Sequence, residues 1–212
     1  MFLSVPILSV AQKTELVIYT GPNLSSLRGN DVLNDYHNAK IGLSTGMGIN
    51  RHFPGKLSIA FSLVYEEKGS QGDIEVLVTY NSFEQLTSTP FKTKYNYLSL
   101  PFTMRYTLGD KVKFNAEIGA YSAYLIRAIA EFDASVIMPA MNENVTSSHK
   151  DFDFGVVFGL GASIPVNERI SIFTSFRENL GLRNISDLPI ANDGAIRTSS
   201  FNLLFGLNYK LK

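Results

Sequence analysis

The residues best suited to chemistry in this 212-residue chain are its three histidines, since it has no cysteine. His149 follows Ser147 and Ser148 and precedes Asp151, so the residue types of a nucleophilic triad lie within five positions. Residues so close along one segment point mostly apart, and a triad is defined by geometry rather than by adjacency. We therefore predict no catalytic residue, and a lipid-modifying hydrolase stays an open alternative.

The sequence contains no convincing motif for binding a metal ion or a cofactor. His37 lies near Asp31 and Asp35, but their spacing matches neither the helical nor the hairpin pattern of metal ligands. Two Gly-x-Gly stretches, at 46–48 and 159–161, are not followed by the helix pattern that a dinucleotide loop requires. The sequence predicts no metal site and no cofactor.

A larger set of charged residues occupies alternate positions, on the same face as glycine, serine, threonine and asparagine. Opposite charges on such a face would form an internal ion-pair network, and a polar conduit or ligand pocket is the other interpretation. The predicted network comprises Arg105, Lys113, Glu117, Arg127, Glu131 and Arg177.

Composition limits the class of protein. The chain is 45% apolar, 12% aromatic and 18% charged, which is typical of an ordered chain rather than a disordered one. Lys and Arg together number 19, as do Asp and Glu, so no global basic field would attract nucleic acid. No stretch reaches the ~18–20 apolar residues that a transmembrane helix needs.

The elements that position the charged residues are strands, because apolar and polar residues alternate with a period of two. In the last fourteen residues, large apolar side chains at odd positions from Phe201 to Leu211 alternate with a face that is polar except for Leu204. The same alternation recurs at 15–22, 41–50, 57–68, 98–108, 112–132, 152–166 and 170–179.

Short and long connections follow each other along the chain. Tight turns rich in Gly, Asp, Asn and Pro lie at 51–55, 109–110 and 167–168. The long connections lie at 23–38, 69–92, 133–150 and 181–197. This order is typical of an outer-membrane barrel with short periplasmic turns and long extracellular loops. Alternating residues within 69–92 also predict an exposed hairpin that could dock a partner.

Side-chain size decides which face points outward. An eight-stranded barrel has an interior barely wide enough for its own side chains, and here the apolar face is the large one. We predict an all-β fold, an eight-stranded antiparallel up-and-down transmembrane β-barrel, with a soluble lipocalin-like barrel that binds a small apolar ligand as the alternative. Five apolar residues should face outward: Leu100, Phe102, Phe158, Leu203 and Phe205.

The first eleven residues are uncharged and end Ser9-Val10-Ala11, like the apolar region and cleavage site of a secretory signal. We predict a signal peptide, truncated at its basic start, at 1–11 and the barrel domain at 12–212. A secreted, cysteine-free barrel of this kind is expected in the cell outer membrane.

Several motifs resemble those of the PorT-like outer-membrane β-barrel domain proteins of Bacteroidota. Tyr97-Leu98-Ser99-Leu100-Pro101 resembles one strand of that family, and 114–121 resembles the next. Asp153-Phe154-Gly155, Gly159-Leu160-Gly161 and 180–185 are similar to its later glycine motifs, whereas the Leu211-Lys212 end departs from its usual aromatic end. The resemblance implies a non-enzymatic barrel, structural or partner-docking, with a secretion-accessory role.

The expected partners follow from this fold. Outer-membrane lipid would surround the wall of a monomeric barrel, and a protein partner would bind the extracellular loops, because the wall and lumen are occupied. An enzyme that modifies outer-membrane lipid remains the third hypothesis.

Overall fold

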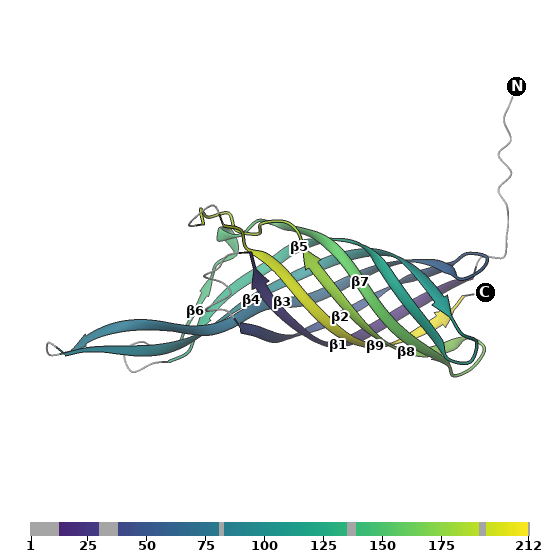
Figure 1. The fold of residues 1–212 in the computed structure, drawn as a ribbon, viewed down its shortest axis with the longest axis horizontal. Helices are drawn as coiled ribbons and strands as arrows, with labels where there is room; N and C mark the ends of the chain where they lie inside the picture. The colour runs from purple at the N-terminus through teal and green to yellow at the C-terminus, as the bar shows by residue number, and fades with distance from the viewer. Residues whose placement is uncertain (1–12, 30–37, 81–82, 135–138, 191–193, 212) are drawn as a thin grey trace, which may run out of the picture.

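The computed structural model describes residues 13–29, 38–80, 83–134, 139–190 and 194–211, so the predicted signal peptide at 1–11 lies outside the described residues. Eight long strands form a closed antiparallel ring in which each pairs with the long strands before and after it (Figure 1). The elements are β1 (Thr14–Arg28), β2 (Asn38–His52), β3 (Leu57–Tyr80), β4 (Phe83–Leu108), β5 (Lys113–Phe132), β6 (Met141–Asn144), a 3-10 turn (Thr146–Ser148), β7 (Phe152–Pro165), β8 (Ile170–Gly181) and β9 (Arg197–Lys210).

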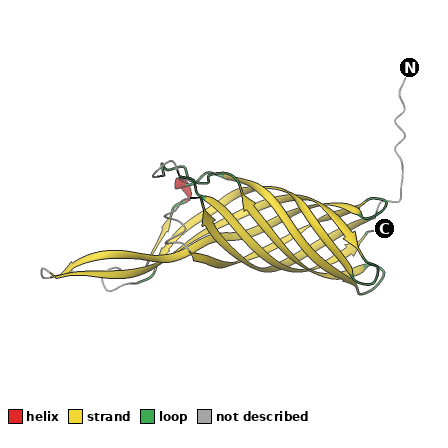
Figure 2. Cartoon of the chain, in the orientation of Figure 1, coloured by secondary structure: helices red, strands yellow, loops and turns green. Residues whose placement is uncertain are grey.

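Closure of the ring confirms the predicted all-β, up-and-down barrel. β1 pairs with both β2 and β9, and β4 pairs with β5. The short strand β6, which the sequence did not predict, pairs with β5 beyond the ring. Figure 2 shows that strands make up most of the described chain. The described residues contain no helix long and apolar enough to cross a membrane.

The two faces of the ring carry different side chains, as predicted. Leu100, Phe102, Phe158 and Phe205 are exposed on the outside, and Leu203 lies on the same side of β9 as Phe205. The inside is filled with small polar residues that are almost fully buried: Ser44, Ser58, Ser62, Ser99, Thr103, Ser175, Ser200 and Asn202. An apolar belt therefore faces outward, where hydrocarbon can cover it.

A β-bulge changes the facing of β5 near its end. Asn96 of β4 pairs with Arg127, but the next residue, Tyr97, pairs with Leu125, so Ile126 has no partner across this ladder. Tyr97 and Leu125 are buried, whereas Arg127 is exposed. The predicted lumen position of Arg127 is therefore wrong, because an extra residue reverses the alternation on which the prediction depended.

The same reversal affects Glu131. It lies past the bulge and beyond the last pairing of β5 with β7, at Tyr124 and Phe152. Its carboxylate accepts a 2.7 Å hydrogen bond from the Lys94 ammonium, and both side chains are partly exposed. Glu131 therefore forms an ion pair outside the lumen rather than within it, which corrects the prediction for this residue.

The β3–β4 hairpin extends far beyond the ring (Figure 1). β2 pairs with β3 as far as Gln71, and β5 pairs with β4 as far as Phe91. β3 and β4 nevertheless remain paired with each other up to Tyr80 and Phe83. This confirms the predicted exposed hairpin within the long connection at 69–92.

An apolar cluster covers the lumen at the end of the barrel where the long connections lie. Ile185, in the β8–β9 connection, is fully buried against ring residues that include Tyr97 and Val157. Backbone hydrogen bonds hold it there, from the Ile185 amide to the Ile196 carbonyl and from the Lys150 amide to the Ile185 carbonyl, each 2.8 Å. The described part of the β8–β9 connection therefore packs onto apolar side chains of the ring and covers the lumen at this end.

Candidate functional site

The lumen holds two layers of charged side chains, and the lower layer centres on Glu117. Its Oε2 accepts hydrogen bonds from Arg105 Nη2 at 2.7 Å and Nε at 3.2 Å, and its Oε1 accepts one from Arg177 Nε at 2.8 Å. Arg177 also donates to the Tyr19 hydroxyl at 3.2 Å. These contacts show that Arg105, Glu117 and Arg177 point inward, as the alternation predicts.

Strand register explains why these three residues meet. Arg105 pairs with Glu117 across β4 and β5, Glu117 pairs with Gly159 of β7, and Gly159 pairs with Arg177 of β8. A Cβ at Gly159 would lie 2.7 Å from the Glu117 side chain. The glycine therefore leaves the space in which the carboxylate reaches Arg177 across an intervening strand.

The upper layer centres on Lys68, whose side chain is fully buried. Its ammonium donates to Asp153 Oδ2 at 3.3 Å and to the Tyr121 hydroxyl at 3.2 Å. It also lies 4.4 Å from the centroid of the Tyr121 ring, within the range of a cation–π interaction. The hydroxyl groups of Tyr121 and Thr198 donate to the same Asp153 oxygen at 2.9 and 2.7 Å.

Glu66 links the two layers. Both of its oxygens accept hydrogen bonds from Asn179 Nδ2 at 3.1 Å, and Oε1 also accepts from the Ser200 hydroxyl and from Asn202 Nδ2. Its Oε2 lies 3.9 Å from the Lys68 ammonium. Glu66 is fully buried, and hydrogen bonds from these neutral donors satisfy both oxygens of its carboxylate.

The two layers balance in charge. Lys68, Arg105 and Arg177 carry three positive charges, and Glu66, Glu117 and Asp153 carry three negative ones. A buried set of charges persists when each is paired and hydrogen-bonded. Between the layers only about 10 Å³ of space remains, which is no more than one water molecule occupies. The lumen is therefore plugged at this level.

The sequence prediction missed half of this network. Glu66, Lys68 and Asp153 lie on the polar face by alternation, yet they were not included in the predicted set. Lys68 and Asp153 are 85 residues apart, and only the closed ring brings them together. The signal that could have found them is their position in the alternation: Glu66 and Lys68 continue the inward face of Ser58 and Ser62, and Asp153 lies between Phe152 and Phe154.

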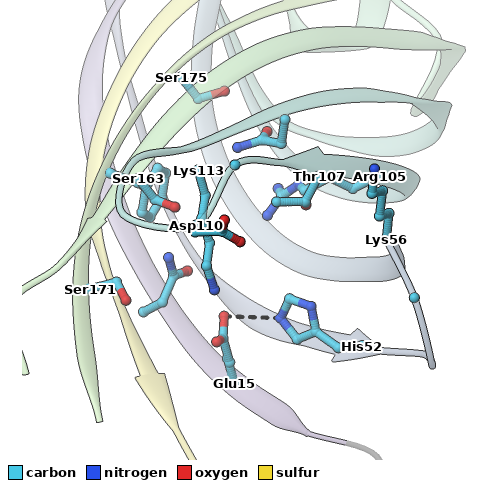
Figure 3. A pocket seen from close by; sticks show the side chains of 15 residues that line it. Glu15, His52, Lys56, Arg105, Thr107, Asp110, Lys113, Ser163, Ser171 and Ser175 are labelled. Carbon is cyan, nitrogen blue, oxygen red and sulfur yellow. Dashed lines mark ion pairs between the residues drawn. The ribbon is translucent and has the colours of Figure 1, made fainter. Parts of the chain in front are cut away.

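Below the lower layer the lumen widens into a cavity of about 480 Å³, which we call the cup (Figure 3). The cup lies at the short-turn end, and turn residues such as Gly55 and Asp110 line its mouth. Lys113 lies here, inside the barrel as predicted but below the ion-pair layers, and Glu15 forms a 3.1 Å ion pair with His52. The predicted network therefore does not extend to Lys113.

His149, the histidine that follows Ser147 and Ser148, makes a contact at each of its ring nitrogens. His149 Nε2 lies 3.1 Å from the Tyr95 hydroxyl, and its Nδ1 lies 2.8 Å from the Val145 carbonyl oxygen. Both ring nitrogens therefore secure a loop rather than activate a nearby serine. The candidate metal ligands around His37 lie outside the described residues. Within the described part of the chain, no cluster of three or more His, Asp or Glu side chains could hold a metal ion.

The fold and the filled lumen define a transmembrane β-barrel with a polar interior. Residues 10–187 match the family model of the outer membrane protein beta-barrel domain. The chain belongs to this family, and the protein is located in the outer membrane. A search of curated proteins gave no match.

Solved structures of outer-membrane barrels have a similar fold. A major outer membrane protein from Thermus thermophilus aligns with a TM-score of 0.53 at 8% identity, covering 95% of this chain and 100% of that one. Neisserial surface protein A gives 0.47 at 12% identity, with coverages of 92% and 97%. Ail of Yersinia pestis gives 0.43 at 12% identity, with coverages of 94% and 99%.

The soluble-carrier alternative is wrong. A lipocalin-like barrel would enclose its apolar face, whereas here the apolar face is outside and the interior is polar and plugged. Family membership and the outer-membrane location agree with this arrangement of side chains.

Proposed function

We propose that this protein is a non-enzymatic outer-membrane barrel that docks a protein partner on its β3–β4 hairpin. The supporting observation is the length of that hairpin beyond the ring, while the lumen behind it is plugged. Past Gln71 and Phe91, neither outer edge of the hairpin is paired with another described strand. Unpaired strand edges bind extended peptides by strand addition.

The hairpin is also acidic. Between Gly69 and Phe91 the sequence contains Asp73, Glu75 and Glu84 but no lysine or arginine. Edge lysines commonly prevent unwanted strand pairing, and this segment has none. A basic extended segment is therefore the partner chemistry that fits it, because charge complementarity would steer the encounter.

The lengths of the connections indicate which end of the barrel faces the periplasm. Outer-membrane barrels have short periplasmic turns and long extracellular loops. By this regularity the hairpin and the connections at 133–150 and 181–197 face outside, and His52 and Asp110 face the periplasm. We further propose that 1–11 is removed as a signal peptide and that 12–212 forms a monomeric barrel in contact with outer-membrane lipid.

A more specific function follows from the resemblance to PorT-like proteins of Bacteroidota. It implies an accessory function in protein secretion, in which the barrel anchors a docking element in the membrane. The closed lumen supports an anchoring role over a conducting one. No residue is assigned a catalytic, cofactor-binding or metal-binding role.

Single cysteines test this proposal, because the native chain has none. Ser88 is exposed on the hairpin, and Asp110 is exposed in a short turn at the opposite end. We expect Ser88→Cys to react with a membrane-impermeant maleimide on intact cells, and Asp110→Cys to react only after permeabilisation. A photo-crosslinker attached at position 88 should then yield a protein adduct of discrete mass.

The matched control is the same crosslinker attached at position 110, which should give no such adduct. The adduct at position 88 should also weaken as ionic strength rises, because exposed charges are screened. Labelling of position 110 but not 88 on intact cells would invert the topology. Correct labelling without any adduct at position 88 would remove the docking role while leaving the topology intact.

A further inference from the structure

The cup at the short-turn end has the form of a ligand site, separate from the hairpin. Strand register arranges its wall in rings beneath the lower charged layer. Thr107 pairs with Asn115, Asn115 with Gly161, and Gly161 with Ser175, so these residues form the first ring below Arg105 and Glu117. Hydroxyl and amide groups therefore line one side of the deepest part of the cup, and Phe173 also contributes to its wall (Figure 3).

The floor of the cup carries an excess of positive charge. Arg105 and Arg177 share the single carboxylate of Glu117, so the lower layer carries one net positive charge, and the carboxylate that balances it lies in the upper layer, farther from the cup. Arg105 lines the cup, and 17% of its side chain is exposed, whereas the Glu117 carboxylate is fully covered. A cation at the closed end of a narrow low-dielectric well attracts anions more strongly than a surface cation does.

An unpartnered group lies in the wall next to this floor. Ser175 is 4% exposed, and its hydroxyl has no hydrogen-bond partner among the described residues. Buried hydroxyl groups are normally hydrogen-bonded, so a rotation of the Ser175 side chain toward the cup would satisfy this covered group. Nearer the mouth, Lys56 and Lys113 add two cations and Asp110 and Glu15 add two carboxylates, so these four charges balance and the excess positive charge of the cup remains at Arg105.

We propose that the cup binds a small hydrophilic molecule that carries one phosphate or carboxylate group. The anionic group lies against the exposed part of Arg105, with Ser175 rotating to donate to it, and the neutral remainder contacts Asn115 and the serines of the wall. The volume of about 480 Å³ is within the usual range for small-molecule sites. This site is independent of the hairpin, and its geometry does not depend on which end faces the periplasm.

The test compares glucose 6-phosphate with glucose, which differ only in the anionic group. Each is titrated into the refolded barrel in an uncharged detergent, and binding is followed by calorimetry and by amide chemical shifts. We expect glucose 6-phosphate to bind at least about tenfold more tightly, as one charge-assisted hydrogen bond implies. Equal affinities, or no saturable binding of either, would overturn the proposal.

Two variants and one control locate the site. Arg105→Gln should abolish the preference for glucose 6-phosphate, and Ser163→Phe should block both ligands by filling the cup without removing a charge. Lys111→Gln removes a charge from the adjoining turn, outside the cup, and should leave affinity within about twofold because exposed charges are screened. Equal losses in Arg105→Gln and Lys111→Gln would indicate diffuse surface charge and contradict a built site.

A lipid headgroup offers the same phosphate chemistry from a second source. Nanodiscs of phosphatidylcholine and of phosphatidylglycerol distinguish the two sources. Glucose 6-phosphate binding in both discs supports a soluble ligand. Binding lost only in phosphatidylglycerol supports the headgroup as the occupant of the same site. Loss in both discs, with binding in detergent alone, would contradict the site in the membrane-embedded protein.

Discussion

Replacing Lys68 by methionine should destabilise the barrel by about 3–5 kcal/mol, the usual cost of leaving a buried partner charge uncompensated. Methionine keeps a similar length and removes the ammonium that Asp153 and Glu66 face. The Asp153 carboxylate would retain only the hydroxyl donors of Tyr121 and Thr198. Urea unfolding of the refolded variant in detergent, followed by tyrosine fluorescence, measures the change.

A double variant shows whether the loss arises from charge. Lys68→Met combined with Asp153→Asn removes the ion pair. The asparagine keeps an oxygen that can accept hydrogen bonds from the same two hydroxyl groups. We expect the double variant to recover at least about half of the lost stability, since paired residues are strongly coupled. Strictly additive losses, or a loss under about 1 kcal/mol in Lys68→Met, would show that the buried pair is not a unit.

The second large effect concerns the facing of the strands. Phe102 is exposed on the outer side of β4, whereas Ser163 of β7 lines the cup. Phe102→Arg should cost about 2–4 kcal/mol because it places a charge in the hydrocarbon region. Ser163→Arg introduces the same side chain into a water-accessible cavity, so it should be tolerated. Assembly is followed by heat-modifiable electrophoretic mobility and by urea unfolding in lipid vesicles.

The comparison is informative because the substituent is the same at both positions. Tolerance of arginine at position 102 together with failure at position 163 would reverse the assigned faces. Equal tolerance would mean that the outer face of β4 does not contact hydrocarbon.

Sequence alternation was sufficient to predict the barrel because lipid imposes the pattern. Each strand must present large apolar residues outward, so Phe102 and Phe205 indicate the outer face without knowledge of their neighbours. Arg105, Glu117 and Arg177 then follow as inward residues by parity. Alternation fails where an extra residue intervenes, as at Ile126, and local sequence gives no sign of that bulge.

The composition of the lumen network was harder to predict, because it depends on ring closure. Lys68 contacts Asp153 from across the barrel, and Glu66 depends on Asn179 and Ser200 of distant strands. The alternation of side chains along each strand predicts that these residues point inward, but it does not predict which of them form ion pairs with one another. The cup was missed for the same reason, because its wall is assembled from strand ends on all sides of the ring.

Electrical recording from a planar bilayer tests the closed lumen most directly. The two charged layers leave about 10 Å³ between them, and the apolar cluster closes the end beyond. We expect the wild-type barrel, inserted as shown by protease protection of its strands, to give no steady single-channel conductance. A stable ohmic conductance from the inserted wild-type protein would contradict a plugged lumen and identify the barrel as a pore.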